Sequence, residues 1–200
     1  MGRTNVLPMY QPTDDPACGP SALKHALAVL GKRKSLETLK EICRVTRNGT
    51  STKSMIRAVN KLGLSALVVK SATLHHLHSA LHYGPNNVRA VMVSYLYDLD
   101  ENKKPISDSG HWATVSGYLS SKSRIVLFDS TKGQKISYPW GQFRRRWNDY
   151  DLKRRRAGRR YKIVRHWQPQ LMMIVAKNVD HLPRFRTSFA RLYETSRGFV

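Results

Sequence analysis

Three segments in the first third of the chain carry apolar residues every three or four positions. That spacing predicts helices that turn one face toward a core. The first runs from Pro20 to Gly31, and Pro20 suits a first helical turn because its missing N–H would be unpaired there. Ser35 is placed to cap the second helix, and Thr50 or Ser51 opens the third. The apolar stripes consist of Ala22, Leu23, Ala26, Leu27, Val29, Leu30, Leu36, Leu39, Ile42, Cys43, Met55, Ile56, Val59 and Leu62.

Beyond residue 63 the apolar residues gather in short β-rich runs separated by polar segments. The expected strands cover residues 64–69, 88–96, 111–118, 124–129 and 170–176. The third and fourth of these strands are close enough in sequence to form an antiparallel hairpin. Further helices are expected at residues 73–81 and 140–147, and a loop at 98–109. Helices followed by antiparallel strands indicate an α+β fold, with the N-terminal helices packed on one face of the sheet.

Two basic segments stand apart from this pattern. Residues 144–165 contain eleven lysines and arginines against two aspartates. We interpret this segment as an insert that is either a solvated loop or a polyanion-binding element. Residues 177–200 form a basic tail, which is expected to hold a short amphipathic helix around Phe185 and Phe189. The predicted organisation is therefore one domain at residues 1–176, including the insert, followed by the tail.

The composition predicts a folded and strongly basic protein. Of its 200 residues, 40% are apolar and 24% are charged, which is enough for a real core. Lysine and arginine number 35 against 13 acidic residues, giving a net charge of +22. A field of this sign attracts nucleic acid, an anionic membrane surface or an acidic protein. Nucleic acid is the favoured polyanion, and its predicted contacts are Arg144, Arg145, Arg146, Lys153, Arg154, Arg155, Arg156, Arg159 and Arg160.

The cysteines and the absence of long apolar runs point to a reducing compartment. The sequence has two cysteines, Cys18 and Cys43, and shows neither a signal-peptide pattern nor a run of about 18 apolar residues. We therefore expect a cytoplasmic protein with free thiols and without a transmembrane helix. Cys43 has apolar helical neighbours and is interpreted as a core residue.

Three residues that are distant in the sequence are suited to form a cysteine nucleophile, its base and the group that orients the base. Cys18 lies at the predicted entrance of the first helix, where unpaired N–H groups and the helix dipole favour a thiolate. His111 begins one strand of the predicted hairpin and Asp129 ends the other, so we expect them to be close in space. An imidazole can act as the base for the thiol, and a carboxylate can orient the imidazole. Gln11, upstream of Cys18, could donate an N–H to a developing oxyanion.

The neighbours of the thiol and the imidazole are the predicted substrate contacts. Gly19 would let a substrate backbone approach the sulfur, and Gly110 directly precedes the imidazole. Trp112 is bulky and is expected to shield the catalytic pair from water.

These motifs resemble a known family. Gln11, the run Cys18-Gly19-Pro20, the run Gly110-His111-Trp112 and the segment 129–133 resemble the papain-like peptidases that cleave double-glycine leaders from bacteriocins. The aromatic segment 138–143 is similar to the element that follows the aspartate in that family. The resemblance covers about residues 9–147, together with the strand at 170–176.

The resemblance implies a papain-like α+β fold and a cysteine peptidase that works through an acyl-thioester. It implies Cys18 as nucleophile, His111 as base, Asp129 as the orienting group and Gln11 as an oxyanion donor. A peptide or protein is the implied substrate, and no cofactor is expected.

Other functions stay open at this point. The chain could be a nucleic-acid-binding protein on an inactive papain-like scaffold. The same triad could also serve acyl transfer, deamidation or a toxin. His75, His78 and His82 share one helical face, but no cysteine or carboxylate nearby completes a metal-ligand set. We therefore predict no metal site.

Overall fold

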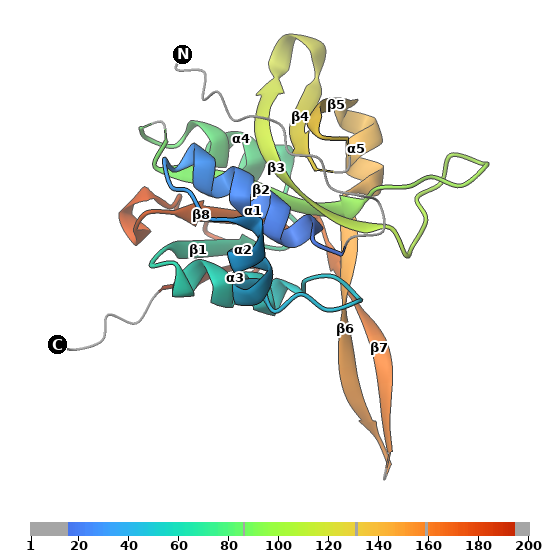
Figure 1. The fold of residues 1–200 in the computed structure, drawn as a ribbon. Helices are drawn as coiled ribbons and strands as arrows, with labels where there is room; N and C mark the ends of the chain where they lie inside the picture. Colours follow the sequence, from blue (N-terminus) through green and yellow to red (C-terminus); the bar gives the residue numbers. More distant parts are fainter. Residues whose placement is uncertain (1–15, 86, 131, 159, 195–200) are drawn as a thin grey trace, which may run out of the picture.

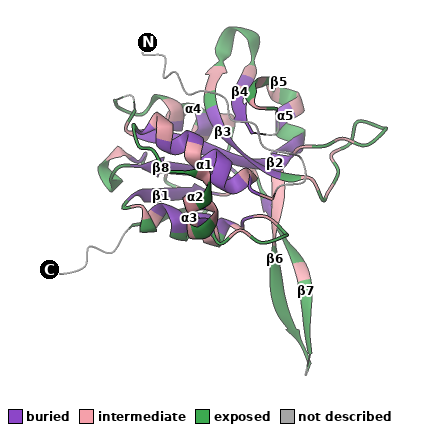
Figure 2. Ribbon diagram, viewed as in Figure 1, coloured by how far each residue is buried: buried purple, intermediate pink, exposed green. Residues whose placement is uncertain are grey.

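The computed structural model describes residues 16–85, 87–130, 132–158 and 160–194. Helices lie across a central sheet, and a long hairpin projects away from the body of the molecule (Figure 1). The sheet and the helices that cover it contain most of the buried residues, whereas the hairpin is exposed along most of its length (Figure 2).

The helices follow the apolar stripes of the sequence. The described α-helices are α1 (Cys18–Val29), α2 (Leu36–Cys43), α3 (Thr52–Lys61), α4 (Leu74–His82) and α5 (Trp140–Arg146). Ser35 caps α2 by accepting the Thr38 amide N–H at 3.1 Å, and Ser51 caps α3 by accepting that of Ser54 at 3.3 Å. The five helices predicted between residues 20 and 147 are therefore confirmed. Among the described residues, no helix is long and apolar enough to cross a membrane.

The main sheet is antiparallel. In the described part of the chain, its strands lie in the order β5-β4-β3-β2-β8-β1-β9, and a separate hairpin pairs β6 with β7. The bounds are β1 (Ser65–Val69), β2 (Arg89–Leu96), β3 (Gly110–Leu119), β4 (Arg124–Asp129), β5 (Gln134–Pro139), β6 (Asn148–Ala157), β7 (Arg160–Pro169), β8 (Met172–Ala176) and β9 (Ala190–Tyr193). All the predicted strands are present, and the α+β class is confirmed.

Two segments fold differently from the prediction. The basic insert is not a loop, because most of it forms the hairpin of β6 and β7, which pair along their full length. The amphipathic helix expected around Phe185 and Phe189 is absent from the described residues, and the chain enters β9 instead. Leu192 of β9 pairs with Leu67 of β1, so this strand covers backbone groups that would otherwise form an exposed edge. Part of the predicted tail therefore belongs to the sheet.

Apolar side chains fill both sides of the sheet. Beneath α1, α2 and α3 the core includes Leu23, Leu27 and Met55. On the other face, α4 and α5 pack over a core that contains Phe143 and Trp147. The ends of β3 and β4, and the start of α1, are thereby held in place by burial on both sides of the sheet.

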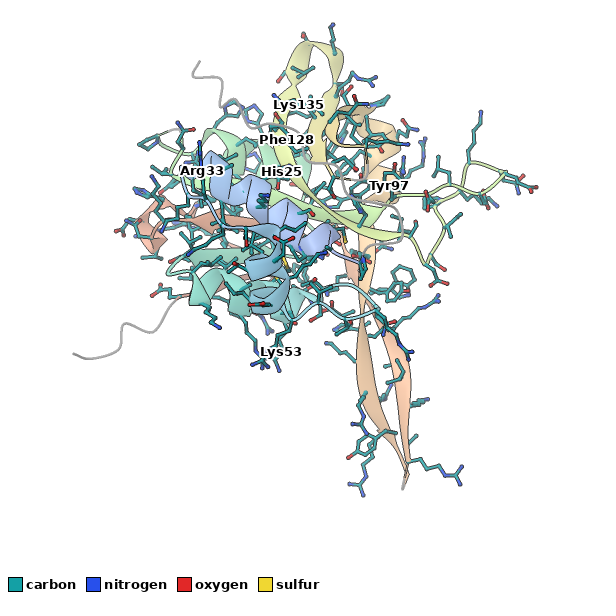
Figure 3. The ribbon with its side chains drawn as sticks, in the orientation of Figure 1. His25, Arg33, Lys53, Tyr97, Phe128 and Lys135 are labelled. Carbon is teal, nitrogen blue, oxygen red and sulfur yellow. The ribbon has the colours of Figure 1, made fainter. Side chains whose placement is uncertain are left out.

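His25 is a buried polar residue within α1. Its side chain lies against Phe128 with ring centroids 5.4 Å apart, and both residues are labelled in Figure 3. Neither ring nitrogen of His25 has a hydrogen-bond partner among the described residues. Burial and the charge of Lys24 lower the pKa of His25 to about 4, although Asp129 opposes the shift. His25 is therefore neutral at neutral pH.

Replacing His25 with leucine is expected to make the fold less sensitive to acid. Between pH 6.5 and about 4, the unfolded chain binds a proton at His25 that the folded chain does not bind. The contribution of His25 to stability therefore falls as the pH falls, by about 2 kcal/mol between pH 7 and pH 5. Urea unfolding of wild type and His25→Leu at these two pH values measures the difference. An equal loss of stability in both proteins would show that the lowered pKa of His25 does not cause the acid sensitivity.

Candidate active site

Cys18 is the first residue of α1, a helix of 12 residues. The first N–H groups of a helix have no partner within it, and the helix dipole favours an anion at this end. Cys18 is half-buried and free, whereas Cys43 is fully buried in the core. Burial raises the pKa of the Cys43 thiol to about 12, so Cys43 stays protonated. Cys18 is therefore the candidate nucleophile of this chain.

His111 and Asp129 lie at neighbouring ends of β3 and β4, where the predicted hairpin puts them. His111 Nε2 lies 3.3 Å from Asp129 Oδ2, and both side chains are buried. Cys18 also lies close enough to His111 to raise the pKa of its imidazole. Since Nε2 faces the carboxylate, Nδ1 is the ring nitrogen left for the thiol. The structure thus brings the thiol, the imidazole and the carboxylate into one cluster.

The charges in this cluster support one another. Burial lowers the pKa of His111, but hydrogen bonds with Asp129 and Cys18, together with their charges, raise it overall to about 10. For Asp129, burial raises the pKa, but hydrogen bonds with His111 and Tyr95 and the charge of His111 lower it overall. At neutral pH the cluster therefore holds an imidazolium beside a carboxylate. A positive charge next to a sulfur is the arrangement that activates cysteine nucleophiles.

Tyr95 is part of this cluster, although sequence reasoning did not single it out. Its hydroxyl donates to Asp129 Oδ2 at 2.6 Å, and it lies directly opposite His111 in the pairing of β2 and β3. The rings of Tyr95 and Tyr97 flank the imidazole, with centroid distances of 5.7 and 5.2 Å. The Lys132 amide N–H donates to Asp129 Oδ1 at 3.3 Å. The sequence alone shows only that a tyrosine occurs in a neighbouring predicted strand. Its place beside His111 becomes clear once the pairing register of the two strands is known.

Replacing Asp129 with asparagine is expected to lower kcat/KM by about 10²-fold or more. The substitution removes the negative charge that helps to hold the His111 pKa near 10, so the imidazolium is lost at lower pH. The alkaline limb of the pH–rate profile should move down by ~1 pH unit or more.

Tyr95→Phe is the matched control for this substitution. It removes a hydrogen bond to Asp129 and keeps the carboxylate charge, so the alkaline limb should stay within a few tenths of a unit. Rate profiles from pH 5 to 11 for both variants test the difference. An unmoved limb in Asp129→Asn would show that this carboxylate does not hold the imidazole.

The predicted substrate contacts have other roles in the structure. Trp112 is buried beneath α1, and its indole N–H donates to the Thr50 carbonyl at 3.2 Å. It is a core residue, so its prediction as a substrate contact is wrong. A Cβ at Gly19 would lie 2.8 Å from Thr50 Cβ, and a Cβ at Gly110 would collide with the carboxyl group of Asp149. Close packing, rather than room for a substrate, accounts for the two glycines.

Asp149 connects the hairpin to the strands of the active site. Its carboxyl group accepts hydrogen bonds from the Ser94 hydroxyl on β2 and, at 2.7 Å, from the Tyr150 amide N–H. Burial raises the pKa of Asp149 to about 6, although these two hydrogen bonds and the charge of His111 oppose the shift. The root of β6 is therefore fixed beside the start of β3.

The predicted polyanion-binding residues are mostly on the surface. Gln11 and Arg159 lie outside the described residues. Arg146 is buried, donates to the Leu96 carbonyl at 2.9 Å and stacks on Tyr138, so its prediction as a polyanion contact is wrong. The other predicted contacts are exposed: Arg144, Arg145, Lys153, Arg154, Arg155, Arg156 and Arg160. No group of three or more potential metal ligands occurs within the described part of the chain.

Comparisons with known proteins agree with this architecture. The sequence signature of the Peptidase C39 family matches residues 7–157. No curated protein shows significant sequence similarity to the chain. The peptidase domain of Streptococcus ComA, a bifunctional ABC transporter of a quorum-sensing pathway, is similar in fold. Its TM-score is 0.59 at 15% identity, over 86% of this chain and 98% of that domain.

A second solved structure shares the fold. It is a double glycine motif protease from an AMS/PCAT transporter, in complex with a leader peptide. Its TM-score is 0.54 at 15% identity, over 86% of this chain and 91% of that one.

Proposed function

Because the chain belongs to the Peptidase C39 family and is a cysteine peptidase, we propose that it cleaves peptide bonds with a triad of Cys18, His111 and Asp129. The observation that carries this proposal is the convergence of the three side chains: His111 contacts both the carboxylate of Asp129 and the thiol of Cys18. Cys18 is the nucleophile, His111 transfers protons, and Asp129 keeps the imidazole oriented and charged.

The proposed reaction has two steps. The Cys18 sulfur attacks the scissile carbonyl carbon, and the imidazolium of His111 gives its proton to the leaving amine as the C–N bond breaks. The product of this step is an acyl-thioester on Cys18 and a free amino terminus. Neutral His111 then takes a proton from water, whose oxygen attacks the thioester. The carboxylic acid leaves as the C–S bond breaks, which restores the thiolate and the imidazolium.

The start of α1 is also suited to stabilise the tetrahedral intermediates. Backbone N–H groups at a helix N-terminus can donate to an oxyanion without reorganising. The amide of Cys18 itself lies at this position. We propose Gln11 as a second donor on the strength of the family resemblance.

We propose a peptide or protein as the substrate and an anionic group as part of what the protein recognises. The similar protease from an AMS/PCAT transporter was solved with a leader peptide, which supports a peptide in the corresponding place here. The net charge of +22 and the exposed arginines of the hairpin support an anionic partner.

Mapping of new peptide termini tests the proposed function. Wild type and Cys18→Ala are incubated with a complex mixture of bacterial peptides and proteins, and amino termini are identified by mass spectrometry. We expect new termini with wild type alone, because cleavage requires the thiol.

The same experiment distinguishes the other reactions of an acyl-thioester. Deamidation would convert glutamine to glutamate without new termini, and acyl transfer would join an added amine to the new carboxyl end. Either result without hydrolysis would replace the peptidase assignment. Identical termini with both proteins would remove Cys18 from the mechanism.

A further inference from the structure

The hairpin of β6 and β7, hereafter the hairpin arm, is anchored at its root. Close to the root, Tyr150 and Arg165 also contact Asp108 of the neighbouring loop. Asp151 accepts the Thr52 amide N–H at 3.0 Å and the Gln168 side-chain N–H at 2.6 Å. Nearby on β6, Asp149 accepts a hydrogen bond from the Ser94 hydroxyl of β2. With ten residues in each strand, the arm is about 33 Å long and extends well away from the body (Figure 1).

The register of the arm sorts its side chains onto two different faces. Residues directly opposite one another share a face, and successive residues alternate between faces. One face, called here the arginine–aromatic face, carries Tyr150, Leu152, Arg154, Arg156, Tyr161, Ile163, Arg165 and Trp167. The opposite face carries Lys153, Arg155, Ala157, Arg160, Lys162, Val164 and His166 beyond the buried root. Cations are thus present on both faces, whereas large apolar groups are concentrated on one.

The arginine–aromatic face exposes more apolar surface than a solvated arm requires. Tyr161 is 62% exposed, Ile163 61%, Leu152 44% and Trp167 40%. Arg154 lies over the Tyr161 ring at 4.6 Å, so the cation and the aromatic group form one surface. A two-stranded hairpin is marginally stable by itself in water, and contiguous exposed apolar residues usually mark an interaction site.

We propose that the arginine–aromatic face of the hairpin arm binds an acidic segment of the protein substrate, one in which apolar side chains alternate with the acidic ones. Arg154 and Arg156 match the charge of such a segment, whereas Arg165 already pairs with Asp108. Leu152, Ile163 and Trp167 match its apolar side chains. Tryptophan, tyrosine and arginine are the residues that dominate protein–protein binding energy, and this face contains no lysine. The identification of the partner as substrate rests on the proposed peptidase function, since the root of the arm lies beside Gly110 and His111.

Nucleic acid fits this face less well. Phosphate contacts need cations alone, and these are available on both faces of the arm. Bases stack on aromatic rings, but Leu152 and Ile163 offer them no such surface. A bilayer also fits less well, because Arg154 and Arg165 stand among the apolar side chains that would have to enter it.

The test compares two double variants with equal loss of charge. Arg154→Gln/Arg156→Gln changes the arginine–aromatic face, and Arg155→Gln/Lys162→Gln changes the opposite face. A third variant, Ile163→Thr, removes an apolar group without altering charge and keeps a β-branched side chain. All variants are made in the entire 200-residue chain carrying Cys18→Ala, and circular dichroism checks that each is folded.

The probe is a fluorescent 12-residue peptide that alternates glutamate with leucine and phenylalanine. We expect the arginine–aromatic double variant and Ile163→Thr each to weaken its binding about tenfold, and the opposite-face variant less than threefold. A peptide with serine in place of leucine and phenylalanine should bind wild type about tenfold more weakly. Fluorescence anisotropy at 150 mM salt measures all these affinities.

Several outcomes would overturn the inference. Equal weakening by both double variants would indicate a general polyanion contact. Tighter binding of a 12-nucleotide oligothymidylate, or of phosphatidylglycerol vesicles, than of the peptide would assign the face to nucleic acid or membrane. Because binding is measured without turnover, failure here leaves the peptidase assignment intact, and loss of that assignment leaves the binding result intact.

Discussion

Cys18→Ala is expected to lower kcat/KM by about 10⁴-fold or more while leaving the fold unchanged. The thiol supplies the electrons that form the acyl bond, and no neighbouring group can replace it. Its place at the first residue of α1 is half-exposed, so a methyl group in place of the thiol removes few core contacts. Thermal unfolding of the variant should therefore match that of wild type within a few degrees.

Cys43→Ala provides a matched control for this loss. Cys43 is the other thiol of the chain, but it is buried in the core, and burial raises its pKa to about 12. Its replacement should cost ~1 kcal/mol or more of stability through the cavity it leaves. Activity of the folded variant should stay within about twofold of wild type, because the triad is intact. Full activity in Cys18→Ala, or its loss in folded Cys43→Ala, would contradict the assignment of the nucleophile.

The helices before residue 147 and the candidate positions of the active site could be predicted from the sequence because each rests on local chemistry. Ser35 and Ser51 cap helices by bonding to amides three residues on, and such caps depend on neighbours in the chain. Cys18 and His111 could be paired because one lies at a helix entrance and the other at a strand start. Their convergence is what the α+β architecture provides.

The sequence could not predict contacts that depend on strand register. Tyr95 meets His111 and Asp129 only because β2 pairs with β3 at one particular offset. Trp112 is one residue beyond His111, so the alternation of the strand sends it to the opposite side of the sheet. The prediction grouped them because they are adjacent in sequence, whereas the pleat separates them.

The strands of the hairpin arm were not predicted because the segment is so highly charged. Runs such as residues 153–156 suggest a solvated loop, because consecutive cations repel one another and are usually exposed to solvent. The strand signal lies in the alternation of Tyr161, Ile163 and Arg165 with their neighbours, and becomes clear when β7 is paired with β6. Half-buried carboxylates at the root, on Asp149 and Asp151, then fix the hairpin to the body.

His111→Ala is expected to lower kcat/KM by about 10³- to 10⁴-fold, nearly as much as loss of the thiol. Members of one catalytic unit are not additive, because a nucleophile without its base and proton donor does little. The variant also removes the positive charge that Asp129 and Cys18 hold on His111, whose pKa they raise to about 10. Alkylation of Cys18 by iodoacetamide at pH 6 should therefore slow by about tenfold or more.

The alkylation rate separates a catalytic histidine from a structural one. A variant that merely loosened the fold would expose Cys18 and speed its alkylation, whereas loss of the imidazolium slows it. His166→Ala is the control, because His166 is an exposed histidine on β7, on the side of the hairpin arm opposite the arginine–aromatic face. Its alkylation and turnover should match those of wild type. An unchanged alkylation rate in folded His111→Ala would show that the imidazole does not activate the Cys18 thiol. The proposed triad would then no longer explain the reactivity of this cysteine.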